Sequence, residues 1–89
     1  MTPEEQMLIS AVRYTLGRQS YIVGITCDFV ANIKEKLSQN CIAIIVRDIE
    51  EELKRYHNFG KMLGMECDER QWVELIGILK DERNKQNAN

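Results

Sequence analysis

Residues 41–58 read CIAIIVRDIEEELKRYHN, and this stretch decides the fold class. Its apolar side chains recur every three or four positions and make one stripe: Ile42, Ile45, Val46, Ile49, Leu53 and Tyr56. This period places side chains on one face of an α-helix, whereas a strand would need strict alternation. The polar residues 38–40 open the helix, and Asn58 and Gly60 end it. The stretch therefore predicts a long helix with one face in a core.

Toward the N-terminus, the sequence predicts two shorter helices joined by a tight turn. The first has Thr2 as its N-cap, Pro3 at its first helical position and Glu5 three residues after the cap, which is the spacing of a capping box. Gly17 is a natural end for this helix. Ser20 then caps a second helix, whose apolar positions recur three or four apart: Ile22, Ile25, Phe29, Ile33 and Leu37.

Toward the C-terminus, a connector over residues 61–67 leads to a fourth helix. Asp68 and Gln71 form its capping box, and its inward positions are Trp72, Leu75, Ile76 and Leu79. From Asp81 the sequence is polar. We therefore expect an all-α protein, a compact bundle of about four short helices. Residues 1–80 form its single domain, and residues 81–89 form a polar C-terminal tail.

Two of these helices carry more apolar surface than one core consumes. On the third helix, Ile44 lies nearly opposite the stripe that contains Ile45. On the first helix, apolar residues and a tyrosine cover more than half of the circumference: Met7, Leu8, Ala11, Val12, Tyr14 and Leu16. Such residues are often harmless at a surface. In an 89-residue chain with a thin stability margin, however, both features together favour a homodimer that completes the bundle.

The composition argues against several classes of protein. The net charge is −2 and the isoelectric point is about 5.4, whereas a dedicated duplex binder carries a basic excess. Nucleic acid is therefore disfavoured as a partner. No apolar run approaches the ~20 residues of a membrane span, and the acidic N-terminus lacks the basic region of a signal peptide. We expect a cytoplasmic protein with no membrane partner.

Motifs for catalysis and for metal binding are missing from the sequence. Cys27, Cys41 and Cys67 are widely spaced, odd in number and without a CxxC pair, so they predict free thiols. His57 is the only histidine, which leaves a zinc site or a Cys–His nucleophile without partners. Phosphate-binding loops, HExxH and GxSxG are also missing. We expect no enzymatic activity, no catalytic residue, no metal and no cofactor.

An acidic run on the third helix has a structural explanation. Glu50 and Glu51 are each followed four residues later by a base, Lys54 and Arg55 respectively. Pairs at this spacing meet on the surface of a helix. The run therefore predicts a solvated helix face with ion pairs along it.

The turn between the first two helices is the candidate ligand site. Residues 13–21 read RYTLGRQSY, and arginine forks bind phosphate while tyrosine rings stack on bases. The start of the second helix adds unpaired N–H groups. The candidate ligand-binding residues here are Arg13, Tyr14, Arg18, Gln19, Ser20 and Tyr21. The alternative is structural: Arg13 and Arg18 pair with Asp48 and Glu51 of the third helix and lock the hairpin.

Three segments carry a resemblance to other proteins. AVRYxLGRxSYIV over residues 11–23, RDIE over 47–50 and GMxCD over 64–68 resemble a group of short uncharacterised proteins of phages, prophages and integrative elements, mainly of Gram-positive bacteria. The resemblance spans residues 7–79, although the segment between His57 and Gly64 is longer here. It implies a counter-defence protein in the host bacterial cytoplasm, whose partner is a nucleotide messenger or a host defence protein.

The resemblance also implies that Arg47 and Asp48 lie near the turn, with Asp48 orienting an arginine. The leading hypothesis is a non-catalytic protein that binds and sequesters a phosphorylated, nucleotide-like signal. Arg13, Arg18 and Arg47 would hold phosphate, and Tyr14 and Tyr21 would stack on a base or ribose. The main alternative is a protein–protein inhibitor or adaptor that uses the acidic face of the third helix or the surplus apolar surface. A DNA-binding regulator is a third hypothesis, which the acidic isoelectric point disfavours.

Overall fold

The computed structural model of this chain describes residues 1–16, 20–58 and 66–88, with side chains described except at residues 20–21, 56–58, 66–68 and 81–88. Within these ranges the chain forms helices and no strand, so the predicted all-α class is confirmed. The elements are α1 (Pro3–Thr15), α2 (Ser20–Ile33), a short 3₁₀ turn η1 (Lys34–Lys36), α3 (Gln39–Asn58) and α4 (Glu66–Ala88).

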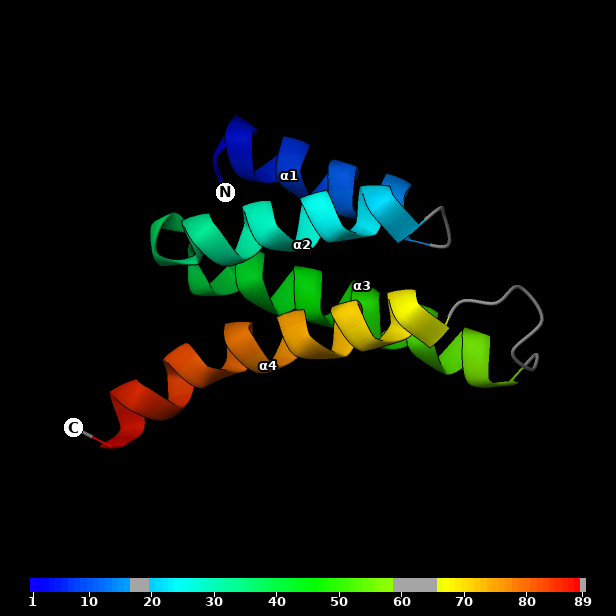
Figure 1. Ribbon diagram of the computed structural model, residues 1–89. Coiled ribbons are helices and arrows are strands. Elements are labelled where there is room, and N and C mark those ends of the chain that lie inside the picture. The colour runs from blue at the N-terminus through cyan, green and yellow to red at the C-terminus, as the bar shows by residue number, and fades with distance from the viewer. Residues whose placement is uncertain (17–19, 59–65, 89) are drawn as a thin grey trace.

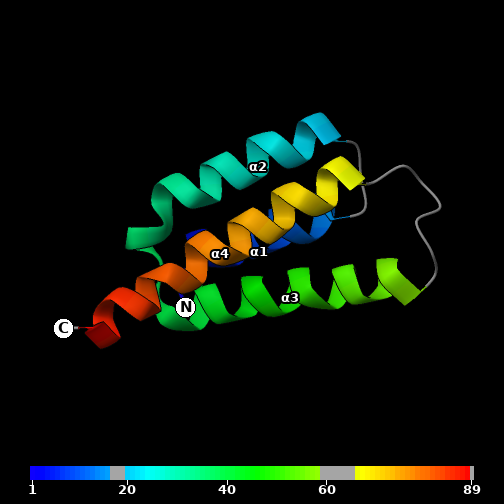
Figure 2. The same cartoon turned by 60° about the horizontal axis from the view of Figure 1, so that its bottom comes forward.

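The four helices are arranged as a bundle (Figures 1 and 2). α2 packs mainly against α4, α1 packs against α3, and α3 in turn packs against α4. The order around the bundle is therefore α1, α2, α4, α3. α1 and α2 form the remaining side, and a groove opens between them.

Most of the core comes from α3 and α4, as the sequence predicts. Ile45 and Ile49 of α3 are fully buried, and the core side chains of α4 are Trp72, Leu75 and Leu79. The prediction that Ile44 faces away from the core is wrong, because Ile44 is partly buried and packs against the core. α3 packs against both α1 and α4, so its buried face is wider than a single stripe.

α2 contributes to the core mainly through a different stripe from the predicted one, although Ile33 and Leu37 of the predicted stripe also pack against the core. Val23, Cys27 and Val30 are its buried residues, whereas Ile25 and Phe29 are 68% and 55% exposed. Both sets repeat at helical spacing, so the period identifies the helix without choosing its inner face. The smaller residues face the core, which allows α2 to pack closely against α4.

The N-termini of α1 and α3 meet at one buried carboxylate. Thr2 and Glu5 form the predicted capping box: Glu5 N–H donates to Thr2 Oγ1 and Thr2 N–H donates to Glu5 Oε1, both at 3.1 Å. Glu5 Oε2 also accepts the N–H of Ser38 at 2.7 Å. Ser38 Oγ in turn accepts the N–H of Cys41 at 3.1 Å, at the start of α3. These backbone donors at Ser38 and Thr2 hold the pKa of Glu5 below its ordinary value.

Both observed ends of α4 differ from the predicted ones. α4 begins at Glu66, before the predicted cap at Asp68, and its backbone continues as helix to Ala88. The backbone of residues 81–88 is therefore part of α4, which extends past the other helices (Figure 1). α1 ends at Thr15, where Leu16 N–H donates to the carbonyl of Val12 at 3.0 Å, and the predicted stop at Gly17 lies outside the described residues.

Candidate functional site

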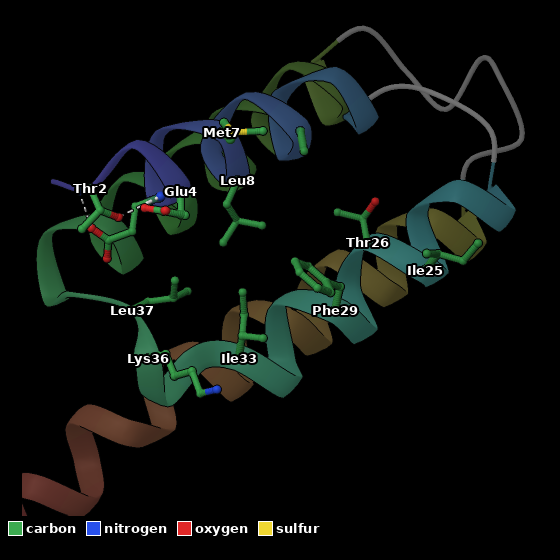
Figure 3. Close-up of a pocket in the computed structure, with 12 residues that line it drawn as sticks. Thr2, Glu4, Met7, Leu8, Ile25, Thr26, Phe29, Ile33, Lys36 and Leu37 are labelled. Carbon is green, nitrogen blue, oxygen red and sulfur yellow. Dashed lines mark hydrogen bonds between the residues drawn. The ribbon is translucent and has the colours of Figure 1, made fainter.

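An exposed apolar surface lies between α1 and α2. Met7 is 72% exposed, and Ile25 and Phe29 of α2 face the same side of the bundle. They line a groove of about 610 Å³, hereafter the α1/α2 groove. Figure 3 shows Leu8 of α1 and Phe29 and Ile33 of α2 pointing into the space between the two helices. The groove is lined by Thr2, Glu4, Glu5, Met7, Leu8, Ala11, Ile25, Thr26, Phe29, Ile33, Lys36 and Leu37.

A hydrogen bond fixes how α1 and α2 are aligned along this groove. The hydroxyl of Thr15, which is buried, donates to the carbonyl of Ala11 at 2.8 Å. Its oxygen also lies 3.1 Å from the hydroxyl oxygen of Thr26. A hydroxyl has one hydrogen, so Thr26 is the donor in the second bond. Thr15 and Thr26 are therefore at the same level of the antiparallel pair, and the buried polar group of Thr15 is satisfied.

Among the residues that the structure describes, the charged side chains that line the α1/α2 groove lie at one end of it. Glu4 belongs to the first turn of α1, and Lys36 ends the 3₁₀ turn that follows α2. Both side chains line the groove (Figure 3), and neither forms an ion pair with another residue of the described ranges. Toward the Thr15 end the lining is apolar except for Thr26. An occupant of the groove therefore needs an apolar face with charges of both signs at one end.

The structure brings together three of the eight residues predicted to bind a ligand. Arg13 Nε donates to Asp48 Oδ2 at 2.7 Å, and Arg47 Nη2 lies 3.8 Å from Asp48 Oδ1. Tyr14 is 63% exposed on α1. Arg18 and Gln19 lie outside the described residues, as do the side chains of Ser20 and Tyr21. The predicted site therefore remains a prediction, and the Arg13–Asp48 pair is the contact that the structural alternative requires.

A polar depression beside this pair has mixed charge. It has a volume of about 310 Å³ and is lined by Arg13, Leu16, Asp48, Glu51, Glu52 and Arg55. Three carboxylates and two guanidinium groups therefore face it. Arg55 Nη1 lies 3.4 Å from Glu52 Oε1, so both arginines already have carboxylate partners. Arg13 keeps further N–H donors beside its Nε–Asp48 bond, but a phosphate bound to them would lie near Asp48 and the other two carboxylates, which is electrostatically unfavourable.

The ion pairs along α3 differ from those expected from spacing alone. Glu50 Oε2 accepts from Lys80 Nζ of α4 at 2.9 Å, whereas Lys54 was its expected partner. Arg55 pairs with Glu52, three residues earlier, instead of Glu51. A neighbouring helix supplies the nearer base in the first case, and the sequence period carries no information about that neighbour. All these side chains are largely exposed except Glu52, so each pair contributes little to stability.

The α2 side of the apolar groove was not predicted from the sequence. The surplus apolar residues of α1 were predicted as an interaction surface, but the Ile25–Phe29 stripe of α2 was expected to be its packing face. A signal was present in the sequence, because α2 carries two apolar stripes where one core needs one. Together with Met7, the second stripe was sufficient to indicate an apolar surface on this side.

The remaining chemical features are few within the described ranges. Cys27 and Cys41 are buried and are not in a disulfide, and the side chain of Cys67 lies outside the described residues. Burial raises the pKa of Cys41, with a further contribution from the charge of Glu5. The part of the chain that the structure describes contains no cluster of three or more His, Cys, Asp or Glu side chains suited to a metal ion. None of its helices, over the same residues, combines the length and apolar character that a membrane crossing requires. The chain matches no protein-family model, no curated protein and no solved structure.

Proposed function

We propose that this chain is a non-catalytic binding protein, an inhibitor or adaptor, that docks an apolar protein surface in the α1/α2 groove. The observation that carries the proposal is the exposure of Met7, Ile25 and Phe29 on one side of the bundle. Single exposed apolar residues are ordinary, but a contiguous set lining one groove is typical of an interaction site.

The shape of the groove favours a helical partner. Ile25, Phe29 and Ile33 are spaced four apart along α2, and Met7 and Ala11 are spaced four apart along α1. Two such rows form a channel that accepts the apolar face of a third helix. Full burial of one large apolar side chain stabilises an interface by about 1.5–3 kcal/mol, while association costs several kcal/mol. Three anchors of this size supply an amount of the same order as the cost of association, so further contacts along the groove have to contribute to a specific complex.

Sequestration of a nucleotide-like signal remains a prediction that the described geometry supports less well. Arg13 is held by Asp48, and the adjacent depression contains more carboxylates than guanidinium groups. The resemblance to phage and mobile-element proteins stays a separate proposal. If it holds, the docked surface belongs to a host defence factor.

Capture of a protein partner from host lysate tests the proposal when three variants are compared. Phe29→Glu places a charge in the groove, whereas Val73→Glu places the same charge on α4 at a residue with similar exposure, 52% against 55%. Arg13→Ala removes the ion pair at the predicted ligand site. We expect one stoichiometric partner that is kept by Val73→Glu and Arg13→Ala and lost by Phe29→Glu.

Two outcomes contradict the proposal. A partner that Phe29→Glu retains does not use the groove. The second measurement is calorimetry with a panel of nucleotides. If a nucleotide gives binding heat with Phe29→Glu but none with Arg13→Ala, the functional site is the predicted ligand site at the turn between α1 and α2.

A further inference from the structure

We infer that the α1/α2 groove is occupied by a second copy of this chain, related to the first by a two-fold axis that runs along the groove. This inference rests on the proposed function, because it uses the same apolar surface; a partner from the host would have to displace the second copy from the groove. It is carried by three features of the groove: the direction of its helices, the level of its side chains and the position of its charges.

The direction of the helices is compatible with this symmetry. α1 and α2 are antiparallel neighbours (Figure 1). Rotation about an axis parallel to them leaves each helix direction unchanged, so α1 of one copy lies against α2 of the other, again antiparallel. The result is a four-helix arrangement in which every adjacent pair is antiparallel, with both apolar grooves facing inward.

The levels of the side chains give complementary sizes across this interface. Thr15 and Thr26 share a level, and both helices rise about 1.5 Å per residue. Ala11, four residues before Thr15, is therefore within about 1.5 Å of the level of Phe29, three residues after Thr26. A two-fold axis along the groove preserves levels, so the small Ala11 of each copy faces the ring of Phe29 of the second copy. By the same count Met7 faces Ile33.

The charges at the end of the groove are complementary between two copies. Glu4 lies eleven residues before Thr15, and Lys36 lies ten residues after Thr26, the last three of them in the 3₁₀ turn, so the two are at nearly the same level. Neither has an ion-pair partner among the described residues. In the inferred dimer, Glu4 of each copy meets Lys36 of the second copy, which makes two reciprocal pairs. A two-fold axis perpendicular to the groove would instead place this charged end over Ala11, Ile25 and Thr26, which are the described lining residues toward the Thr15 end. The charges therefore favour the axis along the groove.

Sedimentation velocity of the full chain, from micromolar to several hundred micromolar, tests whether the second copy binds. We expect a dimer for the wild type and for Val73→Glu. Phe29→Glu and Met7→Glu, which lie on different helices and alter side chains exposed in the single chain, should sediment as monomers. Circular dichroism checks that both variants keep their helix content. A wild-type monomer over the whole range would overturn the inference.

Charge reversal tests the position of the axis. Glu4→Lys gives a chain with two lysines at the groove end, and Lys36→Glu gives a chain with two glutamates there. Each homodimer then contains two like-charge contacts, whereas a mixed dimer contains two Lys–Glu contacts. Native mass spectrometry of an equimolar mixture at low salt should show the mixed dimer several-fold above the statistical half. A statistical mixture would overturn the axis along the groove.

The outcomes separate this inference from the proposed function. A monomeric wild type whose lysate partner is still lost in Phe29→Glu overturns the second copy and leaves the proposed function standing. A dimer that survives both Phe29→Glu and Met7→Glu shows that the groove is not its interface. If the lysate partner also survives Phe29→Glu, both are overturned.

Discussion

The carboxylate of Glu5 accepts backbone hydrogen bonds at the starts of two helices, α1 and α3. The capping box predicts its bond to Thr2, because both partners lie within one helical turn. Its second bond, to the N–H of Ser38, joins residues that are 33 positions apart and depends on how α1 packs on α3. One carboxylate therefore satisfies backbone donors at the start of two helices.

This arrangement makes stability depend on acid in a predictable direction. The pKa of Glu5 is lowered on folding, so its contribution is present above the ordinary glutamate pKa of about 4.3 and is lost as pH falls through the lower folded value. Urea unfolding should show Glu5→Gln clearly less stable than wild type at neutral pH, with the difference shrinking below about pH 4. Glu35→Gln, an exposed control, should match wild type throughout. A Glu5→Gln deficit that is constant with pH would contradict the role of the charge.

For single helices, the sequence predicted where a helix forms better than it predicted which face of that helix is buried. The stripe in α3 and the inward residues of α4 were correct because each of those helices has one dominant apolar face. α2 has two, and the choice between Val23–Val30 and Ile25–Ile33 depends on which neighbour it packs against. The sequence placed Arg13 and Asp48 together through the structural alternative and the RDIE resemblance, but it contained nothing about the competing carboxylates of Glu51 and Glu52 beside them.

The approach of α2 to α4 can be measured with two glycines. A Cβ at Gly24 would lie 2.8 Å from Gln71 Oε1 of α4, whereas a Cβ at Gly77 would have no neighbour within 4 Å. Alanine is favoured over glycine inside a helix by about 0.5–1 kcal/mol. Gly77→Ala should therefore raise the free energy of unfolding by about that amount. Gly24→Ala should gain less, because Gln71 has to move. Equal gains in urea denaturation would mean that α2 and α4 are further apart at this level.

For the whole molecule, the open side of the bundle links folding to assembly. An 89-residue chain has a small core, and here Met7, Ile25 and Phe29 of the α1/α2 groove remain exposed in the single copy. If a second copy covers them, part of the stability comes from association. That part depends on protein concentration by mass action, whereas the stability of an isolated monomer does not.

The midpoint of thermal unfolding should therefore rise with concentration for the wild type. With two chains unfolding together, each tenfold increase in concentration should raise Tm by roughly 3–4 °C. Phe29→Glu should have a lower Tm that is independent of concentration, because it unfolds as a monomer. Val73→Glu, which carries the same new charge outside the groove, should follow the wild-type slope. Scanning calorimetry over a hundredfold concentration range makes the comparison, and a flat wild-type Tm would show that the single chain is the complete folding unit.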